Sequence, residues 1–263
     1  MIAEIRKNYP NVLLVDAGNF LFRSTTLFSI TEEADKVAAH YVGTGMSLVK
    51  YDVANVGPND LTAGLDFLMD IRRDAGFTII SSNIVSSKTN APIFETSVIK
   101  TVGGVKVGFF GIAGGSVSGA HDRESFTFAD PEVTGKKMVA ELSKKAALIV
   151  ALLAMDRKEA YDFAAAVGGI DLIITTSDPQ PIPVPRLIGT AFLASGDEKG
   201  KRVGRATIVV GAARPYIITG EIVPIGSLIN RDPALNNLEY EYYKWLKEHS
   251  PESAGEPPDT TDE

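Results

Sequence analysis

The chain has 263 residues and a mass of 28.1 kDa, with 44% hydrophobic and 22% charged residues. This composition is typical of a folded globular protein and excludes wholesale disorder, a collagen-like repeat and a coiled coil. A net charge of −7 without a basic stripe argues against a nucleic-acid partner. No apolar run is long enough to span a bilayer. The absence of cysteine excludes disulfides and thiolate metal sites.

Strand and helix patterns alternate along the first two thirds of the chain. The predicted strands are residues 12–15, 53–56, 78–80, 96–102, 105–112, 148–152 and 171–175. The predicted helices are residues 2–8, 31–50, 61–75, 131–145 and 159–167. This alternation predicts βαβ units in a mainly parallel sheet, with a hairpin where Gly103 and Gly104 join two strands.

The last third of the chain has a β-rich pattern. It contains predicted strands at 189–195, 203–210 and 216–224 and a final helix at 235–248, whose aromatic residues should pack it onto the sheet. Residues 250–263 are rich in proline and acidic residues, so we expect a disordered tail or linker. One α/β sandwich over residues 1–249 fits this order better than two domains.

Ligands in open α/β sheets bind at the carboxyl ends of strands. That rule selects the loops at 16–20, 57–60, 153–156 and 176–179. The residues in and around these loops resemble the catalytic domain of the 5′-nucleotidase branch of the calcineurin-like metallophosphoesterases. The similar stretches are 11–21, 51–68, 81–84, 98–112, 130–152, 169–175 and 189–210, together with the spacing of Gly189, Thr190, Gly196, Gly200, Gly204 and Arg205. The resemblance implies an α/β sandwich of mixed sheets flanked by helices, with a β-rich C-terminal part.

Enzymes of that family hold two divalent metal ions, such as Mn or Zn, that activate water on a phosphate ester. The chain keeps the loops and lacks the ligands that the resemblance implies. The family's bridging aspartate aligns with Asn19, its metal-binding asparagine with Pro58 and its transition-state histidine with Asn59, which Asp60 follows. A further histidine aligns with Ala154, and the Gly-His-x-His signature aligns with the segment containing Ser177 and Asp178.

These replacements predict a degenerate site with no catalytic residue and no metal or other cofactor. Proline and alanine have no donor atom, and a neutral amide cannot replace a carboxylate between two cations. Asn19, Asn59, Asp60, Ser177 and Asp178 could still line a polar pocket for a small polar ligand. We therefore expect a scaffold or binding module within a larger protein; the alternative is an active metal-dependent phosphohydrolase acting on nucleotides or sugar nucleotides.

Two aspartates allow a second interpretation. Asp16 could be a metal ligand, although an aspartate at a strand end more often bonds its own turn. Asp60 could take part in chemistry, although a carboxylate at a helix start needs only a capping role.

The resemblance also places the family's opening Asp-x-His strand before Met1, so we expect the first strand to be missing. The chain would then be a fragment of a longer polypeptide with other modules, or its neighbouring strands would close up, or another chain would donate a strand. The first residues do not form a signal peptide, and we find no export signal in the sequence as given. The resemblance suggests a periplasmic or extracytoplasmic location.

Overall fold

The computed structural model describes most of the chain. The described residues are 1–115, 117, 119–176, 182, 184–196, 202–212, 214, 216–225 and 232–249. Ser177, Asp178 and the predicted tail at 250–263 lie outside them. Within the described residues, no helix combines the length and the apolar character needed to cross a membrane.

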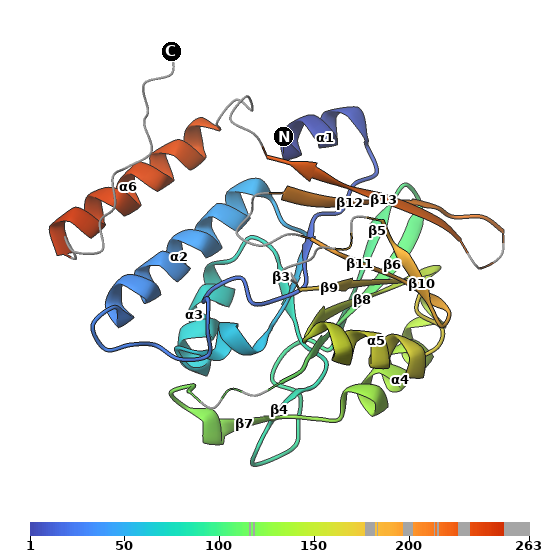
Figure 1. Cartoon of the computed structure of the whole chain (residues 1–263), viewed down its shortest axis with the longest axis horizontal. Helices are drawn as coiled ribbons and strands as arrows, with labels where there is room; N and C mark the ends of the chain where they lie inside the picture. The colour runs from blue at the N-terminus through green and yellow to red at the C-terminus, as the bar shows by residue number, and fades with distance from the viewer. Residues whose placement is uncertain are drawn as a thin grey trace.

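Two β-sheets pack face to face in the middle of the molecule (Figure 1). The smaller sheet is parallel and consists of β1 (Val15–Asp16), β2 (Val53–Asn55) and β3 (Thr78–Ile80). The larger sheet has the order β10-β11-β9-β8-β6-β5 and is parallel at its centre and antiparallel at both ends. Its strands are β5 (Ser97–Val102), β6 (Val105–Ala113), β8 (Leu148–Ala154), β9 (Leu172–Thr175), β10 (Arg186–Ile188) and β11 (Ala191–Ser195).

Two two-stranded sheets also lie in the part of the chain that the structure describes. β12 (Arg202–Val209) pairs antiparallel with β13 (Ile217–Pro224), and β4 (Ile84–Ser86) pairs antiparallel with β7 (Phe126–Phe128). The mixed sheets and the β-rich C-terminal part confirm the predicted fold class.

Six helices accompany the sheets in the described part of the chain. They are α1 (Ile2–Asn8), α2 (Glu32–Val49), α3 (Leu65–Asp74), α4 (Pro131–Leu142), α5 (Arg157–Ala166) and α6 (Pro233–His249), with short 3₁₀ turns η1 (Pro58–Leu61) and η2 (Arg123–Ser125). Leu68 and Ile71 of α3 share one apolar core with Ile79 of the small sheet, and Phe163 of α5 shares another with Ile173 of the large sheet. A third core lies between the sheets. The result is a four-layer α/β/β/α sandwich.

Local sequence accounts for the clearest elements. β8 is an uninterrupted apolar run buried along its whole length, as expected of a central parallel strand. The next helix, α5, begins with a capping box in which Asp156 accepts from the Glu159 N–H and the Glu159 carboxylate accepts from the Asp156 N–H. These signals place a strand and a helix in direct succession, with a strand-end loop between them.

The structure differs from the sequence expectations in a few elements. The predicted helix at 61–75 is divided into η1 and α3 because Gly64, at φ +92°, interrupts the helical backbone. β1 is later and shorter than the predicted strand at 12–15. The final helix packs on α2 and not on a sheet, with the rings of Tyr41 and Tyr242 5.3 Å apart. The interpretation that its aromatic residues pack on the sheet was therefore wrong.

Candidate functional site

The turns that follow β1 and β2 are joined through one buried carboxylate, that of Asp60. Its Oδ2 accepts hydrogen bonds from the N–H groups of Asn19 and Gly57, and its Oδ1 accepts from Leu21 N–H, each at 2.8 Å. Asp60 has no exposed surface. These bonds fix the two strand-end turns to each other.

The electrostatics of Asp60 reflect this position. Burial raises its pKa to about 7, the negative charge of Asp16 adds to the rise, and the three N–H groups oppose it. The expectation that Asp60 lines a polar pocket was wrong, because its carboxylate is enclosed by backbone donors. Asp60 is not the N-cap that the sequence suggested, because Gly57 occupies that position; Asp60 is the third residue of η1, and its carboxylate accepts from Gly57 N–H.

Asn19 and Asn59 lie together, as the loop rule predicts. Asn19 has a left-handed backbone at φ +63°, and its Oδ1 accepts from Asn59 N–H at 2.9 Å. The Asn59 side chain donates to the Phe22 carbonyl oxygen at 3.1 Å. A Cβ on Gly57 would lie 2.2 Å from Asn19 Oδ1, so only glycine allows the turns to approach this closely. Both amides are thus engaged in holding the turns.

Pro58 and Ala154 occupy buried positions beside these turns. Pro58 is the first residue of η1, where a missing N–H costs nothing. Ala154 ends β8 with no exposed surface, and its carbonyl oxygen accepts from Gly114 N–H at 2.9 Å. A Cβ on Gly18 would lie 2.9 Å from that of Ala154, so the end of β8 packs directly on the turn after β1. The structure therefore gathers all the expected positions that it describes.

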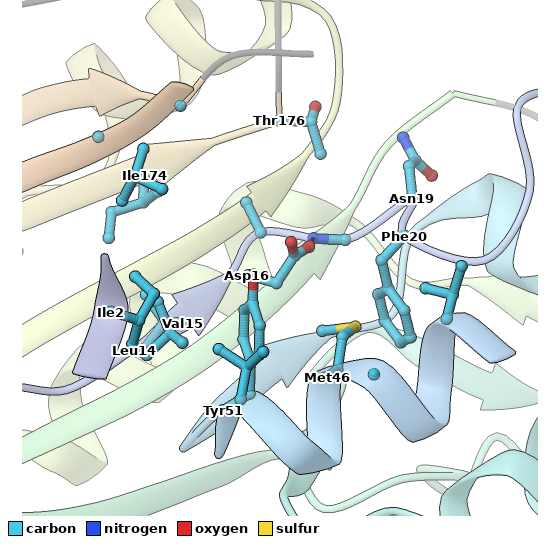
Figure 2. A pocket seen from close by; sticks show the side chains of 18 of the residues that line it. Ile2, Leu14, Val15, Asp16, Asn19, Phe20, Met46, Tyr51, Ile174 and Thr176 are labelled. Carbon is cyan, nitrogen blue, oxygen red and sulfur yellow. Dashed lines mark hydrogen bonds between the residues drawn. The ribbon is translucent and has the colours of Figure 1, made fainter. Parts of the chain in front are cut away.

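Asp16 bonds its own turn, which agrees with the structural interpretation of this residue. Its Oδ1 accepts from Gly18 N–H at 2.8 Å. Burial raises the pKa of Asp16 to about 6, and burial together with the Asp16 charge raises the pKa of Tyr51 to about 12. Figure 2 shows Asp16 between Tyr51 and the end of the pocket where Asn19 and Thr176 lie.

Two buried asparagines were missed by the sequence reasoning. Asn55 Nδ2 donates to the carbonyl oxygens of Ala17 and Ile112, and Asn83 exchanges two 2.8 Å bonds with the Ala113 backbone. Asn55 Oδ1 has no partner among the described residues. An amide inside the apolar run at 53–56 was the available signal for Asn55.

The carboxylates and imidazoles of the described residues do not gather into a metal site. No three His, Cys, Asp or Glu side chains in this part of the chain lie close enough to hold an ion. His40 packs on the Phe67 ring, His121 lies 3.6 Å from Glu32, and His249 stacks on an aromatic ring of α6. At the strand-end turns, the side chains that could ligate a metal are the amides of Asn19 and Asn59 and the carboxylates of Asp16 and Asp60. Each of them forms at least one hydrogen bond to the backbone.

Comparison with known proteins gives relatives in sequence and in fold. No family model matches the chain. It is 24% identical to the 5′-nucleotidase of Vibrio vulnificus over 257 residues, covering 85% of this chain and 45% of that protein. It is 29% identical to the 2′,3′-cyclic-nucleotide 2′-phosphodiesterase/3′-nucleotidase of Salmonella typhimurium over 167 residues, covering 59% and 26%. The chain thus spans less than half the length of these curated relatives.

Solved structures share the fold across 94% of the chain. A 5′-nucleotidase precursor from Thermus thermophilus aligns with a TM-score of 0.77 at 21% identity, covering 52% of that chain. The calcineurin-like phosphoesterase YfkN from Bacillus subtilis aligns with a TM-score of 0.75 at 20% identity, covering 87% of that chain. The sulfate thiohydrolase SoxB from Thermus thermophilus gives 0.81 at 17% identity, covering 46%. At these identities the likeness shows the fold.

Proposed function

We propose that this chain, a relative of the 5′-nucleotidase branch of the calcineurin-like metallophosphoesterases, is a non-catalytic domain that serves as a scaffold or binding module. The observation that supports the proposal most directly is the closed state of its strand-end turns. The Asp60 carboxylate is occupied by three backbone N–H groups, and Asn19 and Asn59 are bonded within the same cluster.

The donors at these turns do not fit two divalent cations. Such a pair requires ligand atoms with free lone pairs, and anionic carboxylates among them offset the repulsion between the two metal ions. Asp60 would have to give up its backbone bonds to ligate, and Pro58 and Ala154 have no side-chain donor. No hydrolytic step is therefore assigned to these residues.

The strand-end turns are held by hydrogen bonds, although their side chains are poor metal ligands. Asp60 and Asn55 connect segments that are far apart in sequence, so they set the geometry at the carboxyl ends of β1, β2 and β6. A scaffold needs this rigidity, and it does not need a free lone pair at the site.

Metal content and turnover together test the proposal. The purified chain is equilibrated with Mn²⁺ or Zn²⁺, desalted and analysed for metal, and phosphate release is measured from AMP and an aryl phosphate. The Vibrio vulnificus relative, treated identically, is the positive control. We expect substoichiometric metal and no turnover above the rate without protein.

Asn59→Ala separates true activity from contamination. If two ions per chain were bound and phosphate release fell in this variant, the proposal would be overturned in favour of an active phosphohydrolase. Release that is unchanged by the variant and not accompanied by bound metal points to a contaminant and supports the proposal.

A further inference from the structure

A small pocket, which we call the α5 pocket, lies between α5 and the large sheet, on the side where α5 contacts β9 and β10 (Figure 1). Its described lining comes from the loop after β8, the first turns of α5, the ends of β9 and β11, and Ile182. Its volume is about 160 Å³. Pockets for drug-sized ligands measure roughly 300–1,000 Å³, and a cavity of about 150 Å³ holds benzene. The α5 pocket therefore has room for a single ring.

The α5 pocket is separate from the strand-end turns, because neighbouring residues of a strand face opposite sides of a sheet. Thr175 lines the pocket, whereas Ile174 belongs to the core between the two sheets. At the end of β8, Ala154 packs on the turn after β1, and the next residue, Met155, lines the pocket and belongs to the core under α5. The pocket and the candidate site thus lie on opposite faces of the large sheet.

Two buried hydroxyl groups lie side by side in the α5 pocket. Thr175 and Ser195 are register partners in the parallel strands β9 and β11, so their side chains are adjacent on one face, and they are only 5% and 3% exposed. Ser195 Oγ accepts a 2.7 Å hydrogen bond from Ile182 N–H. Thr175 Oγ1 has no hydrogen-bond partner among the described residues. Because an unpaired buried hydroxyl is unfavourable, Thr175 favours an occupant that carries a hydrogen-bonding group.

The remaining walls of the α5 pocket are mainly apolar or aromatic. Half of its described lining residues are of this kind, and they are Met155, Ala160, Tyr161, Ile182 and Leu193. Ala160 and Leu193, on α5 and β11, have no exposed surface. An apolar wall with a few placed polar groups is typical of sites for small molecules. The body of an occupant should therefore be apolar.

The charges near the α5 pocket do not favour an anion. Asp156 and Arg157 both line it and have opposite signs. The N-terminus of a helix attracts anions, but that of α5 already holds two carboxylates. Asp156 accepts from Glu159 N–H at 2.8 Å, and Glu159 accepts from Asp156 N–H at 3.1 Å. Both carboxylates would repel a further negative group, so the occupant should be uncharged.

We propose that the α5 pocket binds a small uncharged molecule of about the size of benzene that carries one hydroxyl group. The hydroxyl of this ligand pairs with Thr175 Oγ1, and its apolar body contacts Ala160 and Leu193. The inference goes beyond the proposed scaffold role and concerns the opposite face of the large sheet. Metal content and turnover at the strand-end turns therefore do not bear on it.

Three probe molecules test the proposal on the whole chain. Phenol carries the hydroxyl, benzene lacks it, and benzoate carries a negative charge in its place. Titrations followed by ¹H–¹⁵N NMR measure each affinity and locate the site. We expect saturable one-to-one binding of phenol, with amide shifts at Thr175, Leu193 and Ser195, and no binding of benzoate. Thr175→Val keeps the shape and removes the hydroxyl, so it should weaken phenol binding at least about fivefold and leave the affinity for benzene unchanged.

Thr207→Val is the matched control, because Thr207 is exposed on β12, and it should leave the affinity for phenol unchanged. Circular dichroism verifies that the variants fold, and Thr175→Ala replaces Thr175→Val if the latter does not. Three results would overturn the proposal. They are no saturable binding of phenol, equal phenol affinity of the Thr175 variant and the wild type, and benzoate binding as tight as that of phenol.

Discussion

Removal of the Asp60 carboxylate tests whether one buried group holds the strand-end turns together. Asp60→Ala leaves the N–H groups of Asn19, Leu21 and Gly57 without their 2.8 Å acceptors. A hydrogen bond to a charged group contributes about 1.5–3 kcal/mol. The sum overstates the loss, because the variant also removes a carboxylate whose burial raises its pKa to about 7. We expect a loss of about 3 kcal/mol, a large part of the ~5–15 kcal/mol typical of a domain.

Urea unfolding of variant and wild type, followed by circular dichroism at about pH 8, where the wild-type carboxylate is largely ionised, measures this loss. Asp130→Ala is the matched control, since Asp130 caps α4 with a single exposed bond from Val133 N–H. It should cost about 1 kcal/mol. Asp60→Asn, which keeps one acceptor oxygen, should fall between the two.

The reasoning rests on the three bonds acting together. A loss for Asp60→Ala no greater than that for Asp130→Ala would mean that the turns keep their geometry without the carboxylate. The closed cluster would then be a consequence of the surrounding packing, and the main support for the proposed function would be withdrawn.

Three further changes probe other parts of the fold. Burial raises the pKa of Asp16 from 3.8 to about 6, so the folded state binds the proton more tightly than the unfolded state. The stabilisation from this proton is full below about pH 4 and falls by up to about 3 kcal/mol as the pH rises through about 6. Asp16→Asn should therefore reduce the fall in stability that urea titrations measure across that range, and the rest of the fall comes from Asp60, whose pKa is raised to about 7. Arg214→Ala removes two 2.8 Å contacts to the nearly buried Asp171 carboxylate and should cost about 1–2 kcal/mol by urea unfolding, after allowance for the half-exposed arginine. Gly57→Ala should cost more than about 2 kcal/mol because its Cβ would contact a side-chain oxygen at 2.2 Å, whereas Gly196→Ala, with nothing within 4 Å, should change the melting temperature little.

The sequence predicts the fold best where local signals and tertiary packing agree. β8 and α5 follow from an apolar run and a capping box, which are both local. β1 does not follow, because its two residues are defined by pairing with β2, and the flanking residues at 12–14 have the same apolar character. β4 and β7 are three residues long and pair across about forty residues, so no local pattern indicates them.

The candidate site, like the fold, is only partly predictable from the sequence. The rule that loops gather at strand ends correctly brings Asn19, Asn59 and Asp60 together. It does not predict that Asp60 is enclosed, because its partners are backbone N–H groups whose directions depend on the left-handed turn at Gly18 and Asn19. The partners of Asn55 are likewise distant in sequence, since Ala17 follows β1 and Ile112 lies in β6. Donor direction is a property of the assembled fold.

The closed turns are continuous with β1. The backbone just before β1 is held by the two bonds between Leu14 and Asp52, and the turn after it is fixed by Asp16 and Asp60. β1 itself contributes only two paired residues, so its order depends largely on the bonds at its two ends. Loss of the Asp60 carboxylate should therefore loosen β1 together with the turns.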